Sequence, residues 1–575
     1  MANVTVIING TKVEVPAGST ILDAANKINV HIPTLCYCPD VGCGTANKPA
    51  SCRLCLVEAT GIRGPRKILV PACATPLARD GVEVWTNSNR ALKARRTVLE
   101  LLLSDHPQTC LTCAKNQECE LQKLAAEFGV REIPFRGEMN TFPVDKSAAI
   151  MRDLSKCVMC RRCETVCNKV QTVGALTGNG RGFGAKVGTA SMIPLADSSC
   201  TFCGQCVNVC PVGAIVGVSY VKDVWKAIND PTKTVIVQTA PAVRVAIGAA
   251  YGLPAGENVL DKLVTALKIM GADEVYDTIF GADLTVREES AEFLRRLKTG
   301  ENLPLMTSCC PAWVKYVENE RPEFLKNLST ARSPMQMFAS VLKENYRKKD
   351  AEDGRTTFHI AIMPCTAKKM EARREEFRDA YGVPYVDLVL TTQEVVQMMK
   401  ESGIRFQMLE KESPDLPYGM GSGAAEIFGT SGGVAEAVIR CCTPDKSKNA
   451  LRTIEHSGLR GTDAVRFAEV TINGRKVRAA IVHGLGSAAK LLDQIQSGEV
   501  QADLVEVMSC RTGCVGGAGQ PYALMAKKLQ RAQGLYEIDR SAMFKRSERN
   551  PVIDAMYANG LADRAHELLH IEYKD

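Results

Sequence analysis

Residues 157–167 read CVMCRRCETVC, and residues 200–211 read CTFCGQCVNVCP. Both stretches space four cysteines as C-x2-C-x2-C-x3-C, so one motif occurs twice in close succession. Three thiolates this close along a loop can bind one metal cluster, and the fourth is left for a neighbouring cluster. The repeat therefore predicts a small domain built around two metal clusters.

The other cysteines follow the same trend. The chain has 575 residues and 24 cysteines, of which seventeen lie before residue 211. The N-terminus shows neither a basic region nor a long apolar stretch, so no secretion signal is visible and a disulfide scaffold is not expected. We interpret the clustered cysteines as metal ligands and expect a cytoplasmic location.

The composition is that of a globular protein with about four domains, at roughly 150 residues a domain. Hydrophobic residues make up 45% and charged residues 23%. The net charge of 71 − 64 = +7 comes from interspersed acids and bases, which argues against a nucleic-acid binder. No run of 18 apolar residues occurs, so we expect no membrane span.

The duplicated motif, closed by Pro211, resembles that of bacterial ferredoxins, in which the fourth cysteine of each run binds the other cluster. Two zinc sites also use C-x2-C pairs, but two complete four-cysteine runs favour iron–sulfur clusters. The resemblance implies one [4Fe–4S] cluster on Cys157, Cys160, Cys163 and Cys210. It implies a second on Cys200, Cys203, Cys206 and Cys167.

The N-terminal region is similar to a plant-type ferredoxin. Residues 4–15 read VTVIINGTKVEV, a hairpin signal around Asn9-Gly10, and Thr20 with Asp23 predicts a capped helix of about seven residues. The expected [2Fe–2S] ligands are Cys36, Cys52, Cys55 and Cys73. Cys38 and Cys43 lie within the fifteen-residue first gap, and we choose Cys36 because it follows the strand-like stretch IPTL.

A mixed ligand set lies between these two modules. His106, Cys110, Cys113 and Cys119 could hold zinc as a Cys3His site or a [4Fe–4S] cluster with one histidine ligand. The spacing does not decide between them. The position between two iron–sulfur modules favours a [4Fe–4S] cluster, because an electron relay needs an intermediate cluster there. A preceding helical pattern covers residues 91–103.

After about residue 222 cysteines become sparse, and apolar strands alternate with helical patterns. The strand-like runs are TVIVQ at 234–238, HIAIM at 359–363 and LVEVM at 504–508. Such alternation predicts α/β layers. Each run is followed closely by residues that could take part in a functional site: Ala240-Pro241, Pro364-Cys365 or Cys510. Functional groups gather at the carboxyl ends of strands in such folds.

Three segments of this region resemble the signature segments of [FeFe]-hydrogenases. They are TSCCPAW at 307–313, MPCTAKK at 363–369 and EVMSCRTGC at 506–514. The order of the modules is similar to that of the long, multi-cluster members, such as the catalytic subunits of NAD(P)-linked and electron-bifurcating iron-only hydrogenases. The resemblance implies reversible oxidation of dihydrogen to protons and electrons.

The resemblance also implies an H-cluster, a [4Fe–4S] cubane joined to a di-iron unit with carbon monoxide, cyanide and azadithiolate ligands. The cubane ligands would be Cys310, Cys365, Cys510 and Cys514, with Cys514 bridging to the di-iron unit. Lys368 would contact a cyanide, and a compact ammonium suits an anionic ligand. Residues packing around the di-iron unit would be Ala240, Pro241, Met363 and Met508.

Cys309, next to the cubane ligand, would be the proton donor of this family. By resemblance the relay continues through Glu289, Ser329 and Glu292 to solvent near Arg296. The two glutamates are three residues apart in a helical pattern and so share one face. Without the resemblance, two such glutamates are more commonly part of a solvated helix face.

The expected fold class is an α+β multidomain protein. A β-grasp ferredoxin-like domain with the [2Fe–2S] cluster spans residues 1–80, and a His/Cys3 [4Fe–4S] domain spans 81–139. A bacterial 2[4Fe–4S] ferredoxin-like domain spans 140–222, and an α/β H-cluster domain of two lobes spans 223–575. The expected cofactors are one H-cluster, one [2Fe–2S] and three accessory [4Fe–4S] clusters.

The expected partners are ferredoxin and the flavin/NAD-binding and small iron–sulfur subunits of a hydrogenase complex. A monomeric ferredoxin-linked hydrogenase has the same motifs. An alternative is a pure electron-transfer subunit of a complex-I-like or formate dehydrogenase assembly, which would not need Cys309, Cys310, Cys365, Cys510 and Cys514. A non-catalytic assembly or sensing relative would be expected to lose relay residues, and this chain keeps them.

Some features depart from the family pattern or imitate other sites. Arg511-Thr512 stands where small residues are usual, Ala518 interrupts a glycine run, and Met335 stands where glutamine is common. HELLH at 566–570 matches the zincin pattern, but we expect a surface or packing helix at the C-terminus. The glycine-rich residues 178–184 lack a preceding apolar strand, so we expect no nucleotide site. We expect Cys441-Cys442 to be buried structural thiols.

Overall fold

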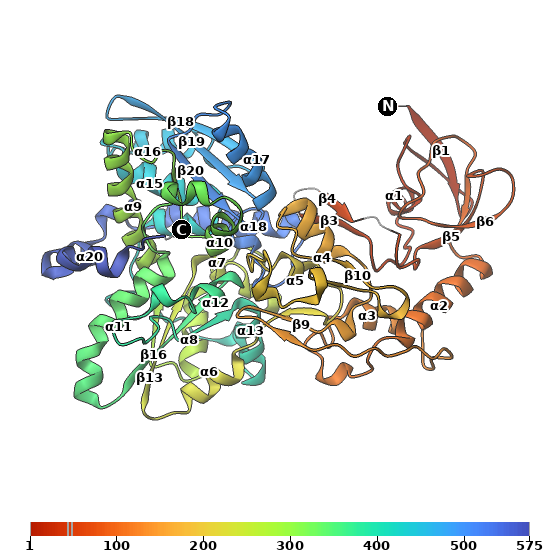
Figure 1. Ribbon diagram of the computed structural model, residues 1–575, viewed down its shortest axis with the longest axis horizontal. Coiled ribbons are helices and arrows are strands. Elements are labelled where there is room, and N and C mark those ends of the chain that lie inside the picture. Colours follow the sequence, from red (N-terminus) through yellow and green to blue (C-terminus); the bar gives the residue numbers. More distant parts are fainter. Residues whose placement is uncertain (1, 43–44, 48–49, 574–575) are drawn as a thin grey trace.

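The computed structural model describes residues 2–42, 45–47 and 50–573. Figure 1 shows the N-terminal sheet at one end of the molecule and a large part with two sheets at the other. The cysteine-rich segment with α4 (Arg162–Thr165) and α5 (Gln205–Val209) lies between them. This order along the molecule follows the order along the chain.

The N-terminal sheet has the strand order β2-β1-β7-β5-β6. Its strands are β1 (Asn3–Ile8), β2 (Thr11–Pro16), β5 (Leu56–Thr60), β6 (Ile68–Pro71) and β7 (Glu83–Trp85). The predicted hairpin is confirmed: β1 and β2 are antiparallel, and Asn9 and Gly10 have φ values of 48° and 85°. The predicted capping box of Thr20 and Asp23 is confirmed at α1 (Ile21–Lys27).

The chain between Cys36 and Cys52 leaves this sheet. It forms the short pair β3 (Cys38–Gly42) and β4 (Thr45–Asn47), which Figure 1 shows beside α4. The long α2 (Asn89–Ser104) confirms the predicted helix, and α3 (Glu120–Glu127) follows the His106 region.

The duplicated motif gives two similar local structures. In each repeat the residue after the second cysteine, Arg161 or Gly204, is left-handed, with φ of 61° or 69°, and a short helix follows, α4 or α5. Small sheets complete this region: β8 (Asp145–Lys146), β9 (Ile150–Arg152) and β12 (Ile215–Gly217) in one, and β10 (Thr177–Asn179) with β11 (Lys186–Gly188) in the other.

The large part contains two four-stranded sheets. The first, of order β14-β13-β16-β17, is parallel throughout and consists of β13 (Lys233–Thr239), β14 (Glu274–Asp277), β16 (Thr356–Met363) and β17 (Leu388–Thr391). The second, of order β15-β20-β19-β18, consists of β15 (Leu305–Met306), β18 (Val465–Ile472), β19 (Arg475–His483) and β20 (Leu504–Met508). Only the β18–β19 pair of this sheet is antiparallel.

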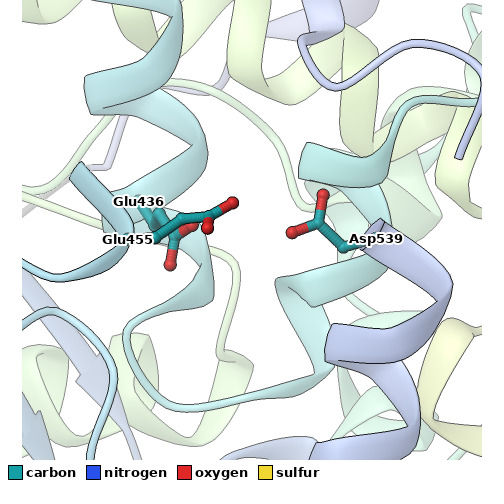
Figure 2. A group of neighbouring side chains, drawn as sticks. All are labelled: Glu436, Glu455 and Asp539. Atoms are coloured by element: carbon teal, nitrogen blue, oxygen red, sulfur yellow. The ribbon is translucent and has the colours of Figure 1, made fainter. Parts of the chain in front are cut away.

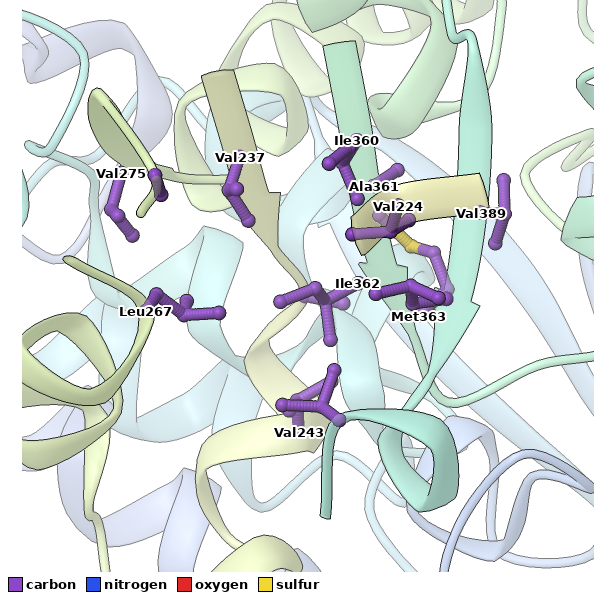
Figure 3. Close-up of a cluster of buried hydrophobic side chains, with 14 of the residues drawn as sticks. Val224, Val237, Val243, Leu267, Val275, Ile360, Ala361, Ile362, Met363 and Val389 are labelled. Carbon is purple, nitrogen blue, oxygen red and sulfur yellow. The ribbon is translucent and has the colours of Figure 1, made fainter. Parts of the chain in front are cut away.

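Helices cover both sheets because the central strands are apolar on both faces. The helices of this part of the chain are α6 (Val221–Ile228), α7 (Pro241–Arg244), α8 (Leu260–Ile269), α9 (Ile279–Thr299), α10 (Pro311–Glu320), α11 (Pro334–Asp353), α12 (Ala367–Glu371), α13 (Thr392–Glu401), α14 (Gly423–Glu426), α15 (Gly433–Cys442), α16 (Lys448–Glu455), α17 (Leu485–Gln496), α18 (Met525–Ser541), α19 (Pro551–Met556) and α20 (Ala562–Leu569), and some of them pack on other helices. Figure 3 shows the core of the first sheet, where Val237, Ile360 and Ile362 meet Val243 of α7 and Leu267 of α8. Among the described residues, no helix is long and apolar enough to cross a membrane.

Candidate active site

The three signature segments meet at one cavity. Its lining combines thiols, apolar side chains and one lysine. Ten of the predicted residues line it: Ala240, Pro241, Cys309, Cys310, Met363, Cys365, Lys368, Met508, Cys510 and Cys514. Segments that are far apart in the sequence thus deliver their chemistry to one place.

Strand ends and helix starts position these cysteines. Cys310 is the N-cap of α10, Cys365 lies between β16 and α12, and Cys510 follows β20. Gly513 has a φ of 85°, and a Cβ there would lie 2.6 Å from the backbone nitrogen of Ser431. Only glycine fits this turn, which brings the next residue, Cys514, to the cavity.

The thiols fit a cluster of iron ions. Burial raises the pKa of Cys365 to about 12, and the neighbouring thiol of Cys310 adds to the effect. Burial likewise raises the pKa values of Cys510 and Cys514, again with contributions from the other thiols. Several thiolates in one apolar cavity are unfavourable alone, whereas a cationic iron core compensates their charge.

Lys368 supplies a fixed positive charge at the cavity. Its Nζ donates to the main-chain oxygen of Cys309 at 3.2 Å and to Glu371 Oε2 at 2.8 Å. Burial alone would lower the pKa of Lys368, but Glu371 outweighs this effect and the pKa is raised. The ammonium therefore stays charged and is available to an anionic ligand.

The predicted proton carriers are buried beside Cys309. Glu289 is 1% exposed and Glu292 is 6% exposed, so these residues of α9 do not form a solvated helix face. Burial raises the pKa of Glu289 to about 8, against the effect of a hydrogen bond with Ser329. The Ser329 hydroxyl donates to Glu292 Oε2 at 3.1 Å, which links the two carboxyl groups. Arg296 itself is 3% exposed, and it bonds to the main chain of the exposed residues Asn302 and Lys326.

The N-terminal cysteines separate into two environments. The Cys36 backbone N–H donates to Cys52 Sγ at 3.4 Å, and hydrogen bonds with Cys52 and Cys73 lower the pKa of Cys36. Cys55 is hydrogen-bonded to Cys73 in the same group. Cys38 instead packs against valines of the middle region, near Cys206. The geometry thus groups Cys36, rather than Cys38, with the other three thiols, and Cys43 lies outside the described residues.

The cysteines of the paired runs lie in two neighbouring groups. One cavity is lined by all four predicted ligands of the first cluster, Cys157, Cys160, Cys163 and Cys210. Burial raises the pKa of Cys206, with further contributions from Cys203, Cys200 and Cys167. The fourth cysteine of each run therefore lies with the first three of the other.

The mixed set also converges. His106, Cys110, Cys113 and Cys119 line one small cavity. Burial lowers the pKa of His106 to about 4, and its buried Nδ1 has no partner within the described part of the chain. A neutral imidazole with a free ring nitrogen is ready to bind a metal. No three of these donor atoms lie within 4.8 Å of one another in the described part of the chain, a spacing wider than the ligands of one zinc ion need.

The patterns that imitate other sites do not form them. Within the described residues, one group of three side chains has oxygen atoms close enough for a metal: Glu436, Glu455 and Asp539, shown in Figure 2. Arg440 and Arg460 bond to all three carboxylates, so these acids are already neutralised. The first four residues of HELLH lie on α20, as the prediction of a C-terminal helix expects, and His570 is the extended C-cap residue. Cys442 is buried and Cys441 is half-buried in α15.

Three contacts could not be read from motifs. Gln205 lies between two expected cluster ligands, and its Nε2 donates to Cys510 Sγ at 3.1 Å. Asn47 Nδ2 donates to the main-chain oxygens of Cys36 and Cys160, at 2.7 and 3.1 Å. Arg511, which departs from the family pattern, pairs with Asp40 at 2.7 Å. The Asn47 and Gln205 contacts each join two expected cluster sites, and the Arg511 contact joins the segments that follow Cys510 and Cys38.

Comparison with protein families gives a match for each region. Residues 233–518 match the C-terminal domain of the iron only hydrogenase large subunit, and residues 525–575 match the iron hydrogenase small subunit. Residues 1–89 match a 2Fe-2S iron-sulfur cluster binding domain, and residues 156–214 match a 4Fe-4S dicluster domain. Residues 95–134 match the iron-sulfur binding region of NADH-ubiquinone oxidoreductase-G.

Individual relatives cover the whole chain. The NADP-reducing hydrogenase subunit HndD of Solidesulfovibrio fructosivorans is 46% identical over 100% of this chain and 99% of its own length. Iron hydrogenase 1 of Clostridium pasteurianum is 35% identical over 99% of this chain and 100% of its own. An apo [FeFe]-hydrogenase structure from Chlamydomonas reinhardtii is 35% identical, with a TM-score of 0.54 over 62% of this chain and 99% of that chain.

Proposed function

This chain belongs to the iron-only hydrogenases, and from that membership we propose that it is the catalytic subunit of an NAD(P)-linked hydrogenase complex. As a member of the family it is an oxidoreductase that uses dihydrogen, with an H-cluster domain and 2Fe-2S and 4Fe-4S domains. This membership excludes the alternative of a pure electron-transfer subunit. The proposal concerns the site residues, the number of clusters and the electron acceptor.

The observation that carries the proposal is the convergence of five cysteines and one buried lysine at a single cavity. In the proposed site, Cys310, Cys365, Cys510 and Cys514 hold the cubane, and Cys514 also holds the di-iron unit. The H-cluster, when bound, supplies the metal site at which dihydrogen is formed or split. Apolar side chains such as Met363 and Met508 exclude water from that site and pack around it.

The protein's own part in the reaction is proton transfer. Cys309 holds a proton at its sulfur on the cavity wall, where burial keeps the thiol protonated by raising its pKa. Glu289, with its raised pKa, exchanges a proton with Cys309 on one side and with Ser329 on the other. Glu292 accepts from Ser329 and forms the inner end of the connection to solvent. These four groups form the proposed relay.

The proposed electron route uses one [2Fe–2S] and three accessory [4Fe–4S] clusters. Their proposed domains span residues 1–80, 81–139 and 140–222, and residues 223–575 form the two-lobed H-cluster domain. The bonds from Asn47 to both Cys36 and Cys160 support direct contact between the [2Fe–2S] site and the first ferredoxin-like cluster site, and the bond from Gln205 to Cys510 supports contact between the second such site and the H-cluster site. At the His106 site a [4Fe–4S] cluster, rather than zinc, fits a position between two redox modules.

The name of HndD supports NADP as the electron acceptor, through a flavin- and NAD(P)-binding partner and a small iron–sulfur subunit. We also propose that ferredoxin is a partner and that the complex bifurcates electrons. The proposed location of the complex is the cytoplasm. Mass photometry of native material, with flavin assayed in the same fractions, tests it. We expect a species much larger than the 62.3 kDa chain that contains flavin and reduces NADP⁺ with dihydrogen. A flavin-free monomer that reduces only ferredoxin would contradict the proposal.

A further inference from the structure

Arg296 encloses one side of Glu292, the last carboxylate of the proposed relay. The guanidinium donates to Glu292 Oε1 at 2.6 Å and to the main-chain oxygens of residues 302, 326, 327 and 328. Its side chain is 3% exposed. A guanidinium stays protonated in proteins, so it cannot give up and regain a proton in each turnover. Arg296 therefore holds Glu292 in place and does not itself carry the proton.

A second set of hydrogen bonds leads from Glu292 to the C-terminal segment. Glu292 Oε2 accepts from the Thr330 hydroxyl at 3.1 Å and from the Thr330 backbone N–H at 3.0 Å. The Thr330 hydroxyl oxygen lies 2.8 Å from His570 Nδ1, and His570 Nε2 lies 2.9 Å from Glu288 Oε2. We propose that protons pass between Glu292 and the surface through Thr330, His570 and Glu288.

The chemistry of the three groups suits this task. For inward transfer, His570 accepts a proton at Nε2 from Glu288 and releases one from Nδ1 to Thr330. Thr330 in turn gives its hydroxyl proton to Glu292. One proton moves along the chain, and His570 is neutral before and after with its proton on the other ring nitrogen. Rotation of the hydroxyl resets Thr330, and His570 regains its first tautomer when its ring turns at the water-accessible edge, releases the Nε2 proton to water and takes one from water at Nδ1; the reverse steps carry protons outward.

Exposure increases along the proposed branch. The side chains of His570 and Glu288 are each 15% exposed, against 5% for Glu292. The Tyr557 hydroxyl bonds to Glu288 Oε1, which leaves Oε2 directed to His570. The branch thus connects a carboxylate that is enclosed by protein to one that water can reach.

Backbone pairing holds His570 against Thr330. The Arg332 N–H donates to the oxygen of Leu569 at 2.8 Å, and the Ile571 N–H donates to the oxygen of Thr330 at 2.8 Å. The Arg332 side chain adds a bond from Nε to the His570 oxygen at 2.8 Å. The histidine of the HELLH pattern is therefore positioned as a proton carrier. His566 stacks on it with ring centroids 5.9 Å apart but lies outside the hydrogen-bonded chain.

The branch rests on the proposed relay, and the test separates the two. His570→Gln can form hydrogen bonds but cannot move a proton between two ring nitrogens. With infrared bands of the metal site unchanged, we expect turnover to fall about tenfold or more, with a larger solvent isotope effect. Thr330→Val, which removes only the hydroxyl from the chain, should behave alike. Imidazole added to His570→Ala should restore turnover, and the exposed His566→Gln is the matched control with wild-type turnover.

Two outcomes of these experiments distinguish a failure of the Thr330–His570–Glu288 branch from a failure of the relay. Wild-type turnover and isotope effect in both His570→Gln and Thr330→Val, together with a strong loss in Glu292→Gln, would overturn the branch but leave the relay intact. Wild-type turnover in Glu292→Gln itself would contradict the relay as well. If His570→Gln loses the infrared bands, Thr330→Val decides the branch, because it keeps the C-terminal segment and its backbone pairing.

Discussion

Glu289 provides the most direct test of how burial serves proton transfer. Glu289→Gln keeps the size of the side chain and its ability to hydrogen-bond with Ser329, but it removes the exchangeable carboxyl proton. The residue is 1% exposed and its Oε2 has no hydrogen-bond partner in the described structure, so few neighbours are disturbed. Glu320→Gln, at an exposed position of α10, is the matched control.

The expected size of the effect follows from the pKa. Burial raises the pKa of Glu289 from 4.5 to about 8, a change of 3.5 units that corresponds to about 5 kcal/mol in favour of the neutral form. At pH 7 the carboxyl is then protonated in about nine molecules of ten, and it ionises as the pH rises through 8. A carrier poised in this way typically contributes about 10²- to 10⁴-fold to a rate.

Infrared difference spectra and turnover measure both consequences in one sample. We expect a protonated-carboxyl band that weakens as the pH rises through about 8 and is missing in Glu289→Gln. Turnover of this variant should fall by about 10²- to 10⁴-fold, while the bands of the metal site and the Glu320→Gln control stay unchanged. A carboxyl already ionised at pH 6, or a Glu289→Gln enzyme with more than about a tenth of wild-type turnover, would refute the reasoning.

Three further changes have defined outcomes. Gln205→Leu removes the hydrogen bond to Cys510. That bond stabilises the reduced cubane over the oxidised one by about 1 kcal/mol, so its loss should lower the cubane potential by roughly 40 mV in a spectroelectrochemical titration. His106→Cys replaces a neutral ligand by a thiolate and should lower the potential of that cluster alone, as followed by electron paramagnetic resonance. Metal analysis that finds bound zinc, with the same iron content in the variant as in the wild type, would contradict the assignment. Arg440→Met leaves Arg460 as the one arginine of this pair facing three carboxylates, and the uncompensated buried charge should reduce the free energy of unfolding by about 3–5 kcal/mol, measured by denaturation, with the metal-site bands retained.

Local features were predictable from the sequence because their physics is local. The spacing of Cys157, Cys160 and Cys163 limits which thiolates can reach one cluster. Asn9-Gly10 favours a tight hairpin, and Thr20 with Asp23 favours a helix start, whatever the rest of the chain does. The structure agrees with each of these.

The arrangement of the site depends on pairings that no local pattern reveals. Cys310, Cys365 and Cys510 come together because β20 lies beside β15 in one sheet and β16 beside β13 in the other. The carboxyl ends of the strands could be predicted as the location of the site, but the order of the strands could not. The resemblance to a family supplied the expected ligand set.

The outer contacts were missed for the same reason. Gln205 and Cys510 are separated by 305 positions, and Thr330 and His570 by 240. HELLH was correctly predicted as part of a C-terminal helix, but its pattern could not show that its last histidine faces Thr330. The resemblance placed solvent near Arg296, but it could not show that five oxygen atoms surround its guanidinium.

Infrared spectroscopy of the anaerobically matured protein, with iron counted in the same sample, tests the central assignment most directly. We expect sharp bands in the carbon monoxide and cyanide stretching region that shift under dihydrogen. In Cys309→Ala we expect those bands to persist while turnover collapses. A matured sample with full iron–sulfur loading and no such bands would contradict the assignment of the cavity at Cys310, Cys365, Cys510 and Cys514 as the H-cluster site.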